Sequence, residues 1–155
     1  MTTREGPTEA ELAAWRSFLR AHAHILRRLE ADLLAQHSLP LSWYDVMLQL
    51  AEAPDQRLRM TELADRVLLS RSGLTRLVDR LERELLVERA ACPGDARVTH
   101  AVLTQAGLER LRAAAPTHLQ GIAELMTDRL DHAELAELSR LMGKLTVPEA
   151  PCDLG

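Results

Sequence analysis

Apolar side chains recur at intervals of three and four residues through most of the chain, a spacing that places them on one face of an α-helix. The first such segment opens at Thr8, which forms with Glu11 the S/T-x-x-E pattern of a capping box, and it runs without Pro or Gly to about Gln36. Its apolar side comprises Leu12, Trp15, Leu19, His22, Leu26, Leu29 and Leu33. A helix of this length spans ~43 Å. We expect this seam to share in a dimer interface, and packing within one chain is the alternative.

Three shorter helical patterns follow a linker at 37–41. The expected helices are 42–54, 60–68 and 70–85, and Leu69-Ser70 leaves only a very short turn between the last two. The apolar face of the 70–85 helix comprises Leu74, Leu77, Val78, Leu81 and Leu85. Its polar face comprises Arg71, Ser72, Thr75, Arg76, Asp79 and Arg83.

A β-hairpin is expected after this helix pair. Residues 86–90 and 98–104 fit short strands, and Cys92-Pro93-Gly94-Asp95 supplies turn chemistry between them. Thr104 then caps a long helix over 105–130, which Pro116 should kink, and Asp131 with Glu134 starts a last helix that runs through Leu145. The pattern therefore predicts a mainly α protein with a small β-hairpin.

Composition agrees with this fold class. Hydrophobic residues make up 46% of the 155 residues but aromatic residues only 3%, which favours helices with aliphatic cores in a single domain. No apolar run approaches the roughly 18 residues that cross a bilayer, and the polar start lacks the apolar core of a signal peptide. Cys92 and Cys152 form no disulfide framework or zinc-ligand spacing. We expect a cytoplasmic protein without a membrane partner.

Charge is segregated along the chain. The formal net charge is −4, yet nine Arg and seven acidic residues lie between Arg57 and Arg97, which leaves that stretch at +2 and the remainder at −6. This asymmetry suggests one basic contact surface on an acidic body.

The basic stretch includes the two helices with the tight turn. In a helix-turn-helix unit, the second helix of such a pair enters the major groove of DNA. Hydroxyl and guanidinium donors gather near the start of the 70–85 helix, at Ser70, Arg71, Ser72, Thr75 and Arg76, and no acid occurs from Ser70 to Val78. Arg97 lies just past the hairpin turn, where it could reach a neighbouring minor groove. A helix cap and a solvated arginine face would be the alternative interpretation.

The order of motifs is more specific than any one of them. Residues 70–82 read S-R-S-G-L-T-R-L-V-D-R-L-E after Leu63-Ala64 and Val67, and Leu86-Val87-Glu88-Arg89 follows. The hairpin then carries D-x-R and L-T in Asp95, Arg97, Leu103 and Thr104. In this order the motifs, with their flanking helices from about Leu12 to Leu145, resemble the MarR (multiple antibiotic resistance regulator) family.

The resemblance implies a winged helix-turn-helix homodimer that represses transcription until a small aromatic or phenolic ligand binds. Residues 1–155 would form a single domain, with dimerisation helices at 8–36 and 105–147 and a DNA-binding lobe at 42–104. Its DNA-binding residues would be Ser70, Arg71, Ser72, Thr75, Arg76, Arg80, Asp95 and Arg97, with Asp95 orienting Arg97 rather than touching DNA. The partners would be a pseudo-palindromic duplex operator and a second copy of the chain, and no cofactor is expected.

Two positions depart from the family pattern. Leu85 stands where the family often has a glycine that relieves a left-handed cap, so it should either strain that turn or extend the helix. A glycine common near the wing tip is also missing, with Val98 nearby. Neither change removes a DNA-contacting group.

The expected effector site lies between the dimer helices and the DNA-binding lobe, as the resemblance implies. Its candidates are Trp15, Arg20, His22, Trp43 and Tyr44. An Arg or His could pair with a carboxylate while an indole stacks on a ring. Core packing for the two Trp and surface exposure for Arg20 are the alternatives.

Other functions find less support. The six His form no ligand spacing for a metal sensor, and Cys92 is a minor candidate for redox sensing. No phosphate loop, GxSxG elbow or HExxH motif indicates an enzyme. A winged-helix protein-interaction module without DNA binding remains an alternative because the overall charge is negative.

Overall fold

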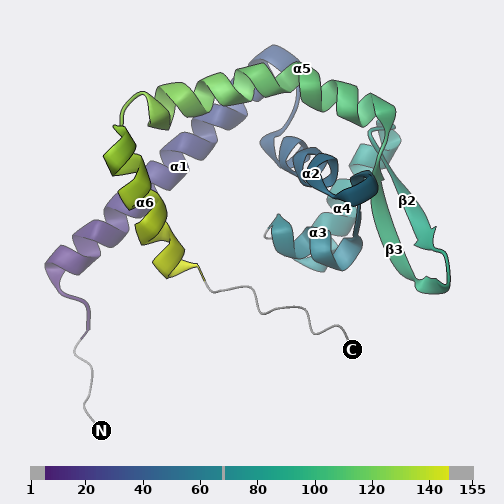
Figure 1. The fold of residues 1–155 in the computed structure, drawn as a ribbon, viewed down its shortest axis with the longest axis horizontal. Coiled ribbons are helices and arrows are strands. Elements are labelled where there is room, and N and C mark those ends of the chain that lie inside the picture. The colour runs from purple at the N-terminus through teal and green to yellow at the C-terminus, as the bar shows by residue number, and fades with distance from the viewer. Residues whose placement is uncertain (1–5, 68, 147–155) are drawn as a thin grey trace, which may run out of the picture.

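The computed structural model describes residues 6–67 and 69–146 (Figure 1). Two long helices, α1 (Glu9–His37) and α5 (Gln105–Ile122), pack against each other, and the shorter elements gather at one end of the pair. That end holds α2 (Leu41–Glu52), a 3₁₀ turn (Pro54–Gln56), β1 (Arg57–Arg59), α3 (Met60–Arg66), α4 (Arg71–Arg83), β2 (Val87–Cys92) and β3 (Asp95–Leu103). A π-helical turn (Ala123–Thr127) links α5 to α6 (His132–Leu145). We call residues 41–104 the winged-helix lobe.

Local capping sets the starts of the helices as predicted. Thr8 and Glu11 close a capping box at α1, and Asp131 and Glu134 close another at α6. The Thr104 hydroxyl accepts a hydrogen bond from the amide of Gly107 (3.0 Å) at the start of α5. These caps satisfy amide groups that lack a partner within the helix.

Most of the hydrophobic core lies within the winged-helix lobe. Fully buried side chains come from the apolar faces of its helices and from β2, among them Leu50, Leu63, Leu74, Leu81 and Val87. Leu33 of α1 and Leu111 of α5 extend the same core, so the lobe is docked onto the paired ends of the two long helices. The predicted apolar face of the fourth helix is confirmed for all its members except Leu85, which is exposed.

The hairpin is part of a three-stranded antiparallel sheet in the order β1-β3-β2. The strand β1, which pairs with β3 at Leu58 opposite Ala101, was not predicted from the sequence. Three residues are too few for a periodic signal, and the strand exists because its backbone groups find partners on β3. The predicted turn between β2 and β3 is confirmed, and Gly94 occupies a left-handed conformation there (φ 113°).

The helix α4 ends at a left-handed residue that is not glycine. Leu86 donates its amide to the Leu81 carbonyl (3.0 Å) and Leu85 donates to the Glu82 carbonyl (3.0 Å), the pair of bonds of a Schellman motif. Leu85 has φ 60°. Of the two outcomes expected at this position, the strained turn occurs and the extended helix does not.

Several predicted boundaries were wrong. The strand β3 begins at Asp95 rather than at 98, and α4 ends at Arg83 rather than at 85. The third helix ends at Arg66 rather than Leu68, because the Leu69 amide bonds back to the Ala64 carbonyl and turns the chain toward α4. The fifth helix is regular only to Ile122, after which a π-turn is closed by the Asp128 amide on the Ala123 carbonyl (2.9 Å). The helix passes through Pro116 without interruption.

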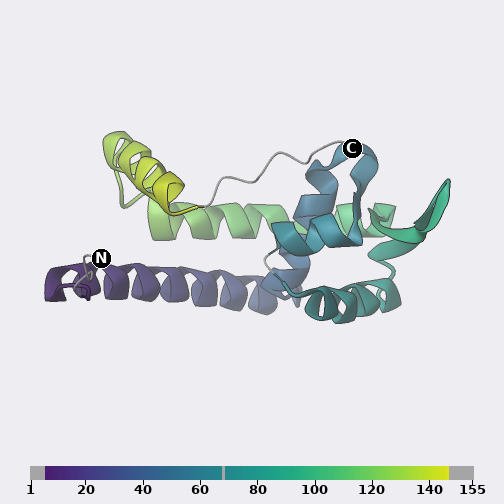
Figure 2. The same cartoon turned by 90° about the horizontal axis from the view of Figure 1, so that it is seen from below.

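The last helix, α6, contributes no buried residue and makes few contacts with its own chain. It crosses α1 in Figure 1, but Figure 2 shows the two on opposite sides of α5. Within the described ranges, no helix has the length and apolar character needed to cross a membrane.

Candidate nucleic-acid interface

The first turn of α4 presents polar groups to solvent. Ser70 is the N-cap, and its hydroxyl accepts a hydrogen bond from the Gly73 amide (3.1 Å). The Ser72 hydroxyl lies 3.3 Å from that of Ser70. No acidic residue occupies this turn, so the positive end of the helix dipole is unopposed and favours an anion such as a phosphate.

Arginines extend this surface along the helix. Arg71, Arg76 and Arg80 are exposed, and none of them forms an ion pair with another residue in the described part of the chain. The Thr75 hydroxyl donates to the Arg71 carbonyl (2.8 Å), which leaves its oxygen free to accept a bond. A guanidinium that is not paired within the protein can bind phosphate or a guanine edge.

The hairpin presents Arg97 beside this helix. One carboxylate oxygen of Asp95 accepts a hydrogen bond from the Arg97 amide (2.9 Å), which holds the backbone of the turn and leaves the Arg97 side chain exposed. This contact is made to the Arg97 backbone and not to its guanidinium, so the orienting role of Asp95 stays a prediction. All the residues predicted to bind DNA are exposed; they lie along α4, from its N-cap Ser70 to Arg80 in its last turn, and at the start of β3.

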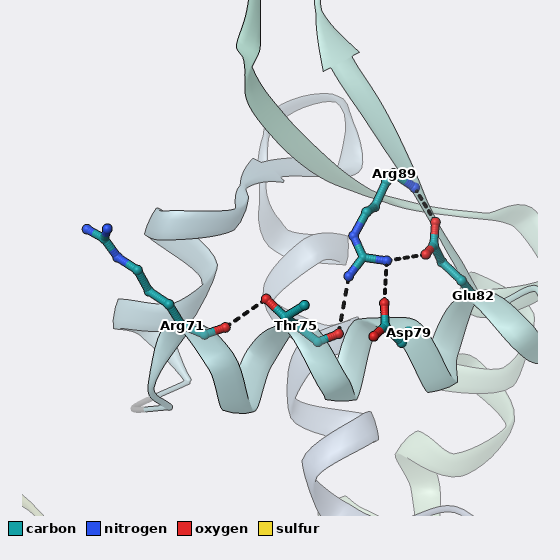
Figure 3. Close-up of polar contacts among 5 residues, drawn as sticks. All are labelled: Arg71, Thr75, Asp79, Glu82 and Arg89. Atoms are coloured by element: carbon teal, nitrogen blue, oxygen red, sulfur yellow. Dashed lines mark hydrogen bonds and ion pairs between the residues drawn. The ribbon is translucent and has the colours of Figure 1, made fainter.

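A half-buried arginine joins the two surfaces (Figure 3). Arg89 of β2 forms ion pairs with Asp79 (2.8 Å) and Glu82 of α4 and donates to the Thr75 carbonyl (3.2 Å). Arg89 belongs to the motif Leu86-Val87-Glu88-Arg89, but no role was predicted for it from the sequence. The only signal in the sequence was that Arg89 lies in the strand directly after a helix that carries Asp79 and Glu82. That order along the chain does not show which carboxylates the arginine will contact.

A cleft of about 400 Å³ lies between α4, the start of α3 and the hairpin. Its lining includes Arg59, Arg89 and Arg97, together with Thr75 and Met60. Arg59 is exposed and is the last residue of β1, so the strand that the sequence did not predict adds a further cation to this face.

The residues predicted to bind an effector do not come together within one chain. Trp15, Arg20 and His22 are exposed on the N-terminal half of α1, whereas Trp43 and Tyr44 lie in α2. From Trp15 to the end of α1 is ~33 Å at 1.5 Å per residue. Phe18, which was not among the candidates, packs between Trp15 and His22, with ring centroids 5.9 Å and 6.1 Å away.

Tyr44 is buried against His118 of α5, with ring centroids 4.3 Å apart. Burial lowers the pKa of His118, and its Nδ1 has no hydrogen-bond partner among the described residues. Burial also raises the pKa of Tyr44, helped by the negative charges of Asp45 and Glu52. This pair joins the lobe to the long helices.

The fold and the exposed cationic face of α4 and the hairpin define a winged-helix DNA-binding protein. The family model described as MarR family matches residues 37–98. The chain is 31% identical over 120 residues to the HTH-type transcriptional regulator MhqR of Bacillus subtilis. The aligned region covers 77% of this chain and 81% of that protein.

Solved structures that resemble this chain include MarR family regulators. The chain is 36% identical to Sco3205, a MarR family transcriptional regulator of Streptomyces coelicolor solved in complex with DNA, with a TM-score of 0.86 over 90% of this chain and 91% of that one. It is 33% identical to AbsC, a MarR family regulator of the same organism, with a TM-score of 0.85 over 91% and 95% of the two chains. The chain belongs to the MarR family. It is a DNA-binding transcriptional regulator and not an enzyme.

Proposed function

We propose that this regulator is a homodimeric repressor that binds a pseudo-palindromic operator and is released by a small aromatic acid. The observation that carries the proposal is a set of large apolar side chains left exposed on α1, α5 and α6. They are Trp15, Phe18, Leu19, Leu26, Leu34, Leu119, Leu141 and Leu145. Exposed apolar side chains in this number on neighbouring helices indicate a surface that another molecule covers.

A second copy is the occupant that fits best. The helix α6 has an apolar stripe and no buried residue, so its own chain does not satisfy it. A groove on that stripe is lined mainly by apolar groups of Leu130, Ala133, Leu138 and Leu141. If α6 of one copy packs against α6 of a second copy, each helix covers the apolar stripe of the other. An isologous interface uses the same surface of both copies in this way.

A symmetric dimer presents two copies of α4 to DNA. Half-site centres about one helical turn apart, ~34 to 36 Å, follow from this symmetry. Each α4 would read bases in the major groove through Arg71, Ser72 and Arg76, and each Arg97 would enter the flanking minor groove.

An aromatic acid is proposed as the effector because exposed aromatic and basic side chains lie together on α1. Trp15, Phe18 and His22 form a row of rings, and Arg20 is exposed nearby. In a dimer, the N-terminal half of α1 would approach the partner, and the residues separated in one chain could line one site between copies. Trp43 and Tyr44 are kept as candidates on the lobe side of that site.

The test is fluorescence anisotropy of the purified protein on its own upstream DNA across a salt series, with and without salicylate-like acids. Tight, salt-dependent binding to one palindrome that an acid weakens supports a ligand-responsive operator-binding regulator. Palindrome binding that no aromatic acid weakens removes the effector. Equal affinity for random DNA at every salt concentration contradicts the repressor and favours a protein-interaction module.

A further inference from the structure

The two parts of the lobe that are predicted to face DNA, α4 and the β2–β3 hairpin, differ in how they are supported by the core. The helix α4 lies against the core through Leu74, Leu77 and Leu81, whereas the hairpin projects from the lobe (Figure 1). Only the base of the hairpin is buried, at Val87, Ala101 and Leu103, and residues 93–97 at its turn are all exposed. For α4 and Arg97 to engage adjacent grooves together, the angle between helix and hairpin must be fixed.

Arg89 makes the polar connection between these parts. Its acceptors are the Thr75 carbonyl, the Asp79 carboxylate and the Glu82 carboxylate, which recur at intervals of four and three residues and therefore line one face of α4. The Arg89 amide also donates to the second oxygen of Glu82 (2.9 Å), so the backbone of β2 and its side chain are both tied to the helix (Figure 3).

A guanidinium suits this connection. Its donors lie in a rigid plane and can bind several acceptors at once, so three acceptors along the helix fix both the distance and the tilt of the strand. An ammonium group is a single point charge and fixes neither. The Arg89 side chain is 26% exposed, which shields its ion pairs from solvent more than those of a surface pair.

The same contacts leave Arg89 little capacity for DNA. Two of its guanidinium nitrogens are bound to α4, while Arg97 lines the same cleft with a guanidinium that pairs with no described residue. We infer that Arg89 is a positioning residue, which holds the hairpin at the angle that lets Arg97 and α4 bind one site together. This inference rests on DNA binding by the lobe.

A double-mutant cycle on the full chain tests the inference, with anisotropy on an operator duplex. Arg97→Ala is expected to lower affinity about tenfold, the effect of one lost charge-assisted contact. Arg89→Ala should lower affinity by a similar factor, and the double variant should lose no more than about twofold beyond either single variant. The salt slope should fall by ~1 in all three variants, since the same phosphate contact is lost.

Direct DNA contact by Arg89 would give a different cycle. The losses would then multiply in the double variant, and its salt slope would fall by ~2. That result overturns the positioning role. Unchanged affinity of Arg89→Ala, with or without a lower melting temperature, also overturns it. The hairpin would then keep its angle without the contacts that Arg89 makes to α4.

Two variants separate geometry from charge. Arg89→Lys keeps the charge but lacks the rigid planar donors that fix the strand relative to the helix, so it should bind like Arg89→Ala; wild-type affinity in this variant overturns the inference. Removing Arg89 also exposes two carboxylates beside the DNA surface. Asp79→Asn with Glu82→Gln in the Arg89→Ala background should therefore leave binding weak, and full recovery would show that Arg89 only neutralises them.

Footprinting gives the direct readout. In Arg89→Ala, hydroxyl-radical protection of the minor groove flanking each half-site should disappear, while α4 still protects guanine N7 in the major groove from methylation by dimethyl sulfate. Arg112→Ala, which removes one charge from an exposed position of α5, is the matched control and should change affinity less than about twofold. If the wild type binds no DNA specifically, the function itself fails; if the wild type binds and Arg89→Ala matches it, only the positioning role fails.

Discussion

Arginines of the lobe fall into two groups by what holds their guanidinium groups. Arg89 is held by the two carboxylates of α4, whereas Arg71, Arg76 and Arg97 carry exposed side chains without an ion pair in the described chain. A free guanidinium keeps its donors for DNA, and a held one fixes structure. The difference lies in neighbours rather than in residue type.

Arg97→Ala should weaken binding to most sequences by about the same factor, since a wing arginine responds to the minor groove and the phosphates rather than to base identity. Titrations on operator and random duplexes measure both affinities. Operator binding that is unchanged in gel shifts would contradict the wing assignment.

Arg76→Ala should lower affinity for the operator more than for random DNA, by about 1–3 kcal/mol of specificity if Arg76 contacts a base edge. The ratio of the two dissociation constants is the measurement. Equal losses on both duplexes would make Arg76 a phosphate contact instead.

His118 should make stability depend on pH. The unfolded side chain titrates near 6.5, and burial lowers the pKa in the folded state, so the unfolded chain binds the proton first. The free energy of unfolding should therefore be highest above about pH 6.5 and fall as pH decreases toward the lowered value. Urea denaturation at several pH values should show a smaller fall in His118→Phe, which retains a ring against Tyr44. The control is His132→Phe, at an exposed position.

Among the elements, the end of α4 shows a local conflict between sequence and structure. The Schellman turn requires a left-handed residue, and the chain supplies Leu85 with a side chain that is 73% exposed. The leucine therefore gains little from burial while its backbone bears the left-handed conformation. The surrounding bonds to Leu81 and Glu82 and the burial of Leu86 hold the turn closed.

Leu85→Gly should raise the free energy of unfolding by about 0.5–1 kcal/mol, because relief of the left-handed strain exceeds the added chain entropy of glycine. Chemical denaturation measures the change. The neighbouring variant Glu84→Gly is the control: Glu84 has φ −86°, so glycine relieves nothing there and should destabilise the protein. Equal destabilisation by both variants would mean that Leu85 is not strained.

For the molecule as a whole, the exposed leucines on the long helices determine the proposed assembly. Leu119 is 62% exposed and Leu145 is 69% exposed, on α5 and α6, although both belong to apolar helix faces. A dimer would bury them and would place two reading helices on one duplex.

Leu145→Glu should convert the dimer to monomer, since a carboxylate buried in an apolar interface costs several kcal/mol. Light scattering after size exclusion gives the mass, and affinity for the palindrome should fall while affinity for a half-site changes little. Leu85→Glu alters an equally exposed leucine of the lobe and should remain dimeric. A dimer that persists in Leu145→Glu would contradict a dimer interface that includes α6.

Short-range patterns were sufficient to predict much of this protein. The capping residues Thr8, Thr104 and Asp131 start their helices as expected, because a cap depends only on residues three positions away. The exposure of Ser70, Arg71 and Arg76 followed from helical periodicity for the same reason. Their role in DNA binding stays a prediction, which rests on the order of motifs.

Contacts between distant segments could not be predicted in this way. The strand β1 exists because β3 offers it hydrogen-bond partners, and Arg89 differs from Arg97 because Asp79 and Glu82 of another element face it. His118 and Tyr44 meet only when α5 packs on α2. Hydrogen bonds and caps within a few residues are encoded locally, whereas pairing, burial and pKa shifts depend on which surfaces the folded chain brings together.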